Sequence, residues 1–463
     1  MAASAGGGQA PQNGGCELTP EPSIRIIPRG ERGFWPARMI SCSTGIREGR
    51  TWDGTAAVAS GGCALQDGNY GRLDAATGLN RRLLDFARSV HYAIDYALDH
   101  GAHLAIFAGD IYKHRDPDPS WQRAFAQCVR RLTDASVPVV ILVGNHDIPN
   151  TVGKAHAVEI FATLGLPGVT VIGQPGLHLI ETAVGRVQVI GLPYITRSFL
   201  LSREEYKDQP IEEINRILVE KAEEILRQFA TQIDPALRAI LTVHGSVANA
   251  VLSSEQSIMM VGHDPIIPLS ALTNPAWDYV ALGHIHRHQD LHQGAQPPVV
   301  YSGSVERIDF GEEREDKGFV WAQVDKGHTT YEFIPGPARR FVTLRLDTQQ
   351  GDPLQLLDQA LTEHDIKDAV VRVIVTVAPE HSDLIDERQI RERLREAYLL
   401  AGIIKEEIKA PARSRDPGLT EVLGPLQAVE RYIFSHPEYT ECRQALLERA
   451  QLLLQELQEE LLA

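Results

Sequence analysis

The chain has 463 residues, of which 43% are hydrophobic and 23% are charged, and its formal net charge is -16. This length is enough to bury a substantial core and to form two or three domains. The acidic balance argues against binding nucleic acid through a broadly basic surface, because such affinity comes from neutralising phosphates with Lys and Arg. Any contact with nucleic acid is therefore expected to be local.

The sequence also argues against a membrane protein, a secreted protein or a protein stabilised by many disulfides. No apolar run of about 18 residues or more is present, and the start of the chain lacks the basic and apolar regions of a secretory signal, so we expect a cytoplasmic location. The five cysteines have no C-x-x-C spacing, which indicates neither a disulfide framework nor a zinc–thiolate site. They are Cys16, Cys42, Cys63, Cys128 and Cys442.

Residues 1–65 differ from the rest of the chain in composition and in hydrophobic pattern. They are rich in Gly, Ala, Ser and Arg and show no sustained helical or strand period, with only a weak strand candidate at Thr55–Ala59. We therefore expect this segment to be largely disordered.

An α/β domain is predicted at residues 69–335. Apolar residues recur at helical spacing between Leu79 and Leu98 and again between Trp121 and Leu132, and the buried-strand patterns HLAIFAGD and PVVILVGN follow these stretches. Later strand patterns are VQVIGL, AILTVHG, DYVALGH, PVVYSG and GFVWAQV. This alternation predicts a layered fold in which polar residues at the carboxyl ends of strands face one crevice.

Two smaller units are predicted after this domain. Residues 340–410 contain FVTLRL, a helix near Pro353–Glu363, AVVRVIVTV and a helix near Asp386–Ala401, an order that suits a small βαβ-type cap domain of the α+β class. Residues 420–463 predict two helices, Leu423–Phe434 and Glu438–Leu462. The second helix has an apolar stripe that suits either packing within its own domain or docking on a partner helix. The stripe consists of Leu446, Leu447, Ala450, Leu453, Leu454 and Leu457.

Four short strings each place a polar side chain where a predicted strand ends. Carboxylate, amide oxygen and neutral imidazole form a ligand set suited to manganese, iron, zinc or related divalent ions. Each string alone is weak, because a single histidine after a strand is more often structural. Four together are hard to explain by packing and predict a metal site. The strings are AGDIYKHRDPDP with Asp110, LVGNHDIPN with Asn145 and His146, TVHGSV with His244, and ALGHIHRH with His284 and His286.

These residue types suit the hydrolysis of a phosphodiester. Two ions about 3.5–4 Å apart can lower the pKa of a bound water and clamp the phosphate oxygens, and a carboxylate such as Asp110 can bridge two cations. His146 could protonate the leaving oxygen as a general acid, and its alternative role is to orient a neighbouring ligand.

The order GD, GNHD, HG, GHxH resembles that of the calcineurin-like metallophosphoesterases. The strings NYGRLDAATGLN, GDIYKHRDPDP and YSGSVERIDFGE are similar to the SbcD branch, bacterial relatives of the eukaryotic break-repair nuclease. The resemblance runs from about Asn69 to the C-terminus and implies a layered α/β/β/α sandwich with a cap domain and C-terminal helices. It implies two divalent ions, with manganese expected. In it, Asp110, Asn145, His244 and His284 hold one ion, Asp110 and His286 contribute to the second, and His146 matches a histidine that donates a proton or contacts phosphate.

The family's Asp-x-His motif, which follows its first strand and supplies two more ligands to the second ion, is not found. The first histidine of the chain is His91, inside a predicted helix, and the text where the motif should lie is ASGGCALQDG. Asp67 is the only carboxylate in that string, but we do not expect it to bind metal, because the expected strand does not precede it. A smaller departure is Lys113, where many relatives have a histidine.

Three explanations of this departure stay open. The first residues could come from a translation or start-site error that replaced the true first strand, they could be a degenerate N-terminus, or an unrelated ligand could substitute. The abrupt change in composition and hydrophobic pattern at residues 65–69 favours the first explanation.

The resemblance implies a metal-dependent DNA exonuclease, with hairpin or single-strand endonuclease activity, that processes double- and single-stranded DNA ends with an SbcC-like coiled-coil ATPase in repair and recombination. A homodimer is compatible with it. One alternative is a phosphoesterase for nucleotides or phosphoproteins, which would need neither cap nor C-terminal helices. The other is a catalytically impaired partner-binding subunit, which the missing motif favours.

Overall fold

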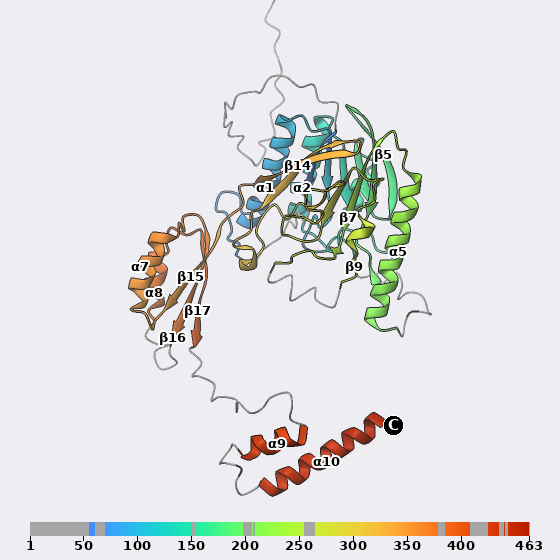
Figure 1. The fold of residues 1–463 in the computed structure, drawn as a ribbon. Coiled ribbons are helices and arrows are strands. Elements are labelled where there is room, and N and C mark those ends of the chain that lie inside the picture. Colours follow the sequence, from blue (N-terminus) through green and yellow to red (C-terminus); the bar gives the residue numbers. More distant parts are fainter. Residues whose placement is uncertain are drawn as a thin grey trace, which may run out of the picture. The chain divides into compact units, whose positions relative to one another are not determined.

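The computed structural model of the chain, drawn in Figure 1, describes residues 55–60, 70–149, 153–197, 206, 209–253, 264–377, 385–407, 425–434, 439 and 443–462. All the elements described below belong to one compact unit, formed by Asp53–Asp74 and Leu79–Ala463.

Two mixed six-stranded sheets form the largest part of this unit. The first has the order β14-β13-β1-β2-β3-β4, with β1 to β4 parallel, and the second has the order β11-β12-β10-β7-β6-β5, with β6, β7, β10 and β12 parallel. The first sheet consists of β1 (Thr55–Ser60), β2 (Leu104–Phe107), β3 (Val139–Leu142), β4 (Val169–Ile172), β13 (Gly318–Asp325) and β14 (His328–Pro335). The second consists of β5 (Gly176–Thr182), β6 (Gly185–Leu192), β7 (Arg238–His244), β10 (Tyr279–Gly283), β11 (Gln289–Asp290) and β12 (Val299–Tyr301). A separate short parallel pair is formed by β8 (Ser246–Val247) and β9 (Ile266–Ile267).

Alternating side chains of the central strands build three apolar cores. Leu104 and Ile106 of β2 belong to a core between the two sheets, which also contains Ile240 of β7. Ala105 and Phe107, on the opposite face of β2, pack in a second core under α1 (Arg81–Asp99) and α2 (Pro119–Asp134). A third core lies between the second sheet and α5 (Ile211–Gln232). The order of layers is therefore α/β/β/α, and strands buried on both faces explain the continuous apolar runs in the sequence (Figure 1).

Strand β1 corrects one expectation from the sequence. We expect segment 1–65 to be largely disordered, with only a weak strand candidate at Thr55–Ala59, yet Thr55–Ser60 lies in the middle of the first sheet. It pairs antiparallel with β13 from Thr55↔Val324 to Ala59↔Val320, and parallel with β2 from Ala57↔Leu104 to Ser60↔Phe107. Backbone pairing on both edges outweighs a weak local strand pattern. The rest of segment 1–65 lies outside the described residues.

A smaller three-stranded parallel sheet follows, with the order β15-β16-β17. Its elements are β15 (Phe341–Asp347), α7 (Pro353–Glu363), β16 (Val370–Val377), α8 (Glu387–Arg393) and β17 (Leu399–Glu407). The helix expected at Asp386–Ala401 is wrong in its second half, because α8 ends at Arg393 and the residues from Leu399 pair with β16. Strand pairing decides the conformation there, as it does at β1.

The buried Glu306 connects α1 to the segment that leads into this smaller sheet. Its carboxylate accepts hydrogen bonds at 2.9 Å from the backbone N–H groups of Arg307 and Arg339, and the Arg82 guanidinium of α1 lies 3.7 Å away. Arg339 in turn donates to Asp85 of α1 at 2.6 Å. The middle of the string YSGSVERIDFGE therefore has a structural role.

Two helices end the described chain, α9 (Pro425–Phe434) and α10 (Arg443–Leu462). They contact each other, with the Arg443 guanidinium 4.8 Å from the centre of the Phe434 ring.

Candidate metal centre

Four of the predicted metal ligands lie at the carboxyl ends of parallel strands. Asp110 and Asn145 follow β2 and β3 of the first sheet, whereas His244 ends β7 and His284 follows β10 of the second sheet. Because β7 and β10 are neighbours, as are β2 and β3, each sheet contributes an adjacent pair of side chains. The centre is therefore built where the edges of the two layers meet.

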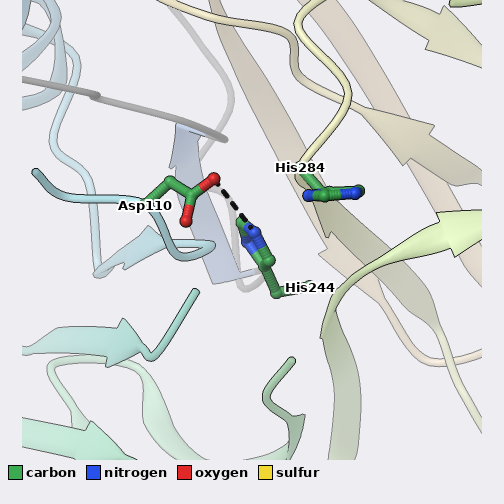
Figure 2. Close-up of side chains that lie close together, drawn as sticks. All are labelled: Asp110, His244 and His284. Atoms are coloured by element: carbon green, nitrogen blue, oxygen red, sulfur yellow. Dashed lines mark ion pairs between the residues drawn. The ribbon is translucent and has the colours of Figure 1, made fainter. Parts of the chain in front are cut away.

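The structure brings these four side chains together. One ligand atom from each of Asp110, His244 and His284 lies within 4.8 Å of the other two, and all three residues are buried (Figure 2). His244 Nε2 is 3.2 Å from Asp110 Oδ2. Asn145 Oδ1 lies 3.0 Å from His244 Nε2 and 2.9 Å from His284 Nδ1. One carboxylate, one amide oxygen and two imidazole nitrogens thus converge, a donor set that suits a divalent transition metal.

The protonation of His244 is coupled to its neighbours. Its Nδ1 lies 2.7 Å from the carbonyl oxygen of Ala108, which assigns the proton to Nδ1 and leaves Nε2 for a metal. Burial raises the pKa of the Asp110 carboxyl, but the facing His244 imidazole more than offsets this, and the net pKa lies below its ordinary value. Burial lowers the pKa of His244, whereas Asp110 raises it, and the net direction is upward. A metal cation held by Asp110 and His244 would take the place of the proton on His244 Nε2, and that proton would be released.

Two of the four predicted ligands have strained backbone. Asp110 has a φ of 52° and His284 has a φ of 95°, both in the left-handed region that residues with a Cβ rarely adopt. The glycines before them allow close approach of the two sheets. A Cβ on Gly283 would lie 1.8 Å from the Ala108 carbonyl oxygen, and one on Gly109 would lie 2.1 Å from His244 Nδ1. The glycines of the GD and GHxH strings are therefore required by packing at the centre.

Asp264 orients His284, and the sequence did not point to it. Its Oδ2 lies 2.7 Å from His284 Nε2, so the other ring nitrogen, Nδ1, is the one that faces Asn145. The carboxylate also accepts hydrogen bonds from the Tyr194 hydroxyl at 3.0 Å and the Ser246 hydroxyl at 3.1 Å. A carboxylate held in this way fixes the tautomer and ring orientation of a metal-binding histidine.

Asp147 is a second residue that motif reasoning passed over, although it belongs to GNHD. It is fully buried and accepts backbone hydrogen bonds from Gly144 at 2.9 Å, Tyr112 at 3.3 Å and Ile111 at 3.4 Å. It therefore ties the loop after β3 to the loop after β2. Burial, followed by the nearby Asp110 carboxylate, raises its pKa.

His146 lies at the open side of the centre. Its backbone N–H donates to Asp110 Oδ1 at 2.9 Å, and its Nδ1 lies 2.9 Å from the carbonyl oxygen of Lys113. This contact assigns a proton to Nδ1 and leaves Nε2 of an exposed ring available to a substrate.

Comparison with known proteins identifies the domain that carries this centre. The family model for calcineurin-like phosphoesterases matches residues 80–288, which include all four converging ligands and His146. Residues 80–288 are a calcineurin-like phosphoesterase domain.

Relatives of the phosphoesterase domain include named nucleases. The chain is 28% identical over 302 residues to the DNA double-strand break repair protein Mre11 of Haloferax volcanii, covering 63% of this chain and 56% of that protein. It is 29% identical over 273 residues to the D component of the nuclease SbcCD of Rhodobacter capsulatus, covering 55% and 64%. It is 24% identical over 258 residues to the metallophosphoesterase YhaO of Bacillus subtilis, covering 53% and 51%. The chain thus spans between about half and two thirds of the length of these curated relatives.

A second ion of the phosphoesterase domain would find fewer donors. His286 does not join the group of mutually close ligand atoms, and its Nδ1 lies 2.7 Å from Glu312 Oε1. Glu312 is buried and is held by Lys317 at 2.9 Å; although burial raises its pKa, His286 and then Lys317 lower it to about 2. Such a fixed carboxylate orients His286 so that Nε2 remains the nitrogen for a ligand.

The residues of the phosphoesterase domain therefore fit one divalent ion better than two. Asp110, Asn145, His244 and His284 offer four donors to the first ion, whereas Asp110 and His286 are the only predicted donors for a second. The chain has no histidine before His91, so no Asp-x-His motif can follow β1. Asp67 lies outside the described residues. Within the described part, none of the helices combines the length and apolar character that crossing a bilayer requires.

Proposed function

We propose that the chain is the nuclease subunit of an SbcD-type assembly that hydrolyses phosphodiester bonds at DNA ends with a divalent metal, manganese being the expected ion. The observation that carries the proposal is the convergence of Asp110, Asn145, His244 and His284 at the edge of a phosphoesterase domain. The names of the Haloferax and Rhodobacter relatives support DNA as the substrate.

Each group of the centre has a proposed task. A bound metal ion would lower the pKa of a water and neutralise charge on the phosphate. Asp110 and the imidazoles of His244 and His284 hold the ion, and Asp264 keeps His284 from rotating. In its imidazolium form, His146 donates the Nε2 proton to the leaving oxygen and becomes neutral, while its Nδ1–H stays bonded to the Lys113 carbonyl. His286 contributes to a weaker second position.

The partners and location are part of the same proposal. The Rhodobacter relative is named as one component of the nuclease SbcCD, which supports an SbcC-like coiled-coil ATPase as partner. We propose that the protein acts in the cytoplasm on double- and single-stranded ends during repair and recombination, and that a homodimer is compatible with this role.

A test of this function separates metal binding from cleavage. Calorimetric titration with manganese should show binding by the unaltered chain and none by the combined variant Asp110→Ala and His244→Ala. Unchanged binding by that variant would refute the site. Cleavage of linear duplex DNA and of single strands is then compared with hydrolysis of bis(p-nitrophenyl) phosphate. Hydrolysis of the small diester without DNA cleavage would leave a phosphoesterase with a different substrate.

A partner-binding subunit with impaired catalysis is a second candidate, because of one specific observation. The second ion lacks both ligands of the Asp-x-His motif. This candidate predicts manganese binding and ATPase capture with no hydrolysis of either substrate.

A further inference from the structure

A polar cavity of about 500 Å³ is lined by chain neighbours of His286 and of its partner Glu312. Its lining includes Arg287, which follows His286 in the chain, and Gly311, which precedes Glu312. Glu312 contacts His286. The two backbone segments that line the cavity therefore also carry His286 and the carboxylate that orients it. The volume lies within the roughly 300–1,000 Å³ of pockets that hold small ligands.

Two guanidinium groups line this cavity. Arg287 and Arg314 are exposed, line the cavity, and make no side-chain hydrogen bond or ion pair with other residues in the described part of the chain. The two carboxylates of the lining already have cationic partners. Glu315 Oε2 lies 2.9 Å from Lys317 Nζ, and Asp316 interacts electrostatically with Arg307. The two arginine side chains can therefore bind an anion, and guanidinium groups suit phosphate oxygens.

Another part of the wall is aromatic and apolar. The rings of His288 and Phe333 stack with centroids 4.3 Å apart and planes 18° from parallel, and Leu252 adds apolar surface. His288 Nδ1 lies 2.9 Å from the Tyr301 carbonyl oxygen, which fixes the imidazole ring. A rigid aromatic pair beside two arginines matches the combination that single-stranded nucleic acids require, with stacking for a base and cations for the backbone.

We propose that this cavity, called here the flanking pocket and defined by Arg287, Arg314, His288 and Phe333, binds the nucleotide next to the cleaved phosphodiester in an unpaired DNA end. The arginines contact its phosphate and the aromatic pair contacts its base. A base inside a duplex is stacked on its neighbours, so the pocket selects unpaired nucleotides. The inference rests on the proposed nuclease function and explains how a chain with net charge -16 contacts DNA locally.

Binding is the decisive measurement, because it does not depend on cleavage. A short fluorescein-labelled oligothymidylate is titrated by anisotropy without manganese. The combined variant Arg287→Ala and Arg314→Ala should raise Kd on the order of tenfold or more. It should also reduce the slope of log affinity against log salt by about 0.7, because the two arginines share one single-strand phosphate. The matched control is Arg130→Ala with Arg227→Ala, which removes two exposed charges from α2 and α5.

The base contribution is tested with Phe333→Leu, which keeps an apolar residue in β14. This variant should lose affinity for oligothymidylate but not for an abasic strand of the same length, and its thermal melt reports whether β14 is intact.

An unchanged Kd of the double arginine variant, or an equal loss in the control, would overturn the proposal. If DNA is bound through the arginines yet never cleaved, the nuclease function fails and the pocket stands. If DNA is cleaved and Kd does not depend on the arginines, the pocket fails and the nuclease function stands.

Discussion

At the scale of single residues, the centre depends on groups that hold the ligands as well as on the ligands. Asp264 contacts His284, Glu312 contacts His286, and the Ala108 carbonyl contacts His244. Each histidine is thereby restricted to one ring nitrogen for metal binding. The strained backbone at Asp110 and His284 persists because these contacts and the close glycine packing leave no alternative position.

Replacement of Asp264 tests this restriction. Asp264→Ala frees His284 Nε2 and leaves the Tyr194 and Ser246 hydroxyls without their acceptor, so manganese affinity should fall by about 10–100-fold. Asp264→Asn, which retains an acceptor oxygen for Nε2–H, should recover most of the affinity. Calorimetric titration measures both, and thermal melts show whether the fold is kept. Wild-type affinity in a folded Asp264→Ala variant would contradict the assigned role.

Sequence patterns predicted the candidate ligands that lie together in the structure but not the residues that support them, for a physical reason. Asp110, Asn145 and His284 come within three residues after an apolar strand and His244 ends one, and the end of a parallel strand is where such patterns place a site. Asp264 reaches His284 across 20 residues of chain, through a contact that no local period encodes. Glu312 was within a quoted string, but only its contact with His286 shows its role.

At the scale of elements, β1 shows the same difference between local pattern and tertiary pairing. The string TAAVAS is short and rich in alanine, and its neighbours in the sheet come from β2 and from β13, which lies more than 250 residues away in the chain. The sheet therefore has no gap at this position. What the chain lacks is the ligand motif and not the strand.

Restoring that motif at the end of β1 should complete the second ion site. Ser60 pairs with Phe107, three residues before Asp110, so Ser60→Asp with Gly62→His places Asp-x-His where β1 ends. Gly61→Asp with Cys63→His covers a register one residue later. Manganese stoichiometry should rise from one to two ions per chain. DNA cleavage should rise on the order of a thousandfold, since a second ion contributes several kcal/mol to the transition state.

The control for this graft is Ser60→Asn with Gly62→Gln, which has similar size and poor ligands. Two bound ions in the ungrafted parent would show that another residue already completes the site, whereas one ion in both grafted variants, with melts like the parent's, would show that the motif does not form a site there. Equal activity in graft and control would lead to the same conclusion.

The contact between α1 and α2 should make stability depend on pH. His91 Nδ1 lies 2.8 Å from Arg131 Nη1, and burial, followed by Arg131, lowers the pKa of His91 below 6.5. Below pH 6.5 the unfolded chain binds a proton that the folded chain does not, so this stability is present above pH 6.5 and is lost as pH falls. The slope is at most about 1.4 kcal/mol per pH unit for one group. Urea unfolding at several pH values should show a smaller loss in His91→Gln than in the parent, and parallel curves would contradict the assignment.

At the scale of the whole molecule, the described chain contains a phosphoesterase layer structure, a three-stranded parallel unit and a pair of helices, and only the first contains the candidate metal ligands. The acidic net charge and the local positive charge of the flanking pocket suit a protein that meets DNA at an end and not along its length. In the proposed assembly, the SbcC-like ATPase is the subunit that supplies a binding surface for long DNA.

The last helix is the proposed contact with that subunit. Leu446 and Leu453 of α10 are 38% and 44% exposed and lie seven residues apart, on one face of the helix, whereas the side chains of Leu454 and Leu457 lie outside the described residues. Leu446→Glu with Leu453→Glu should weaken capture of an SbcC-like ATPase by about a hundredfold or more, because each leucine buried in an interface contributes about 1.5–3 kcal/mol. The matched control is Gln444→Glu with Gln451→Glu, which adds the same charge at two exposed polar positions of α10. Co-purification with a tagged ATPase, followed by interferometry, measures the loss, and manganese titration verifies that the metal centre is unaffected. Full capture by the leucine variant, or by a chain that ends at Gly424, would show that the partner binds elsewhere and that α9 and α10 serve the fold of this chain alone.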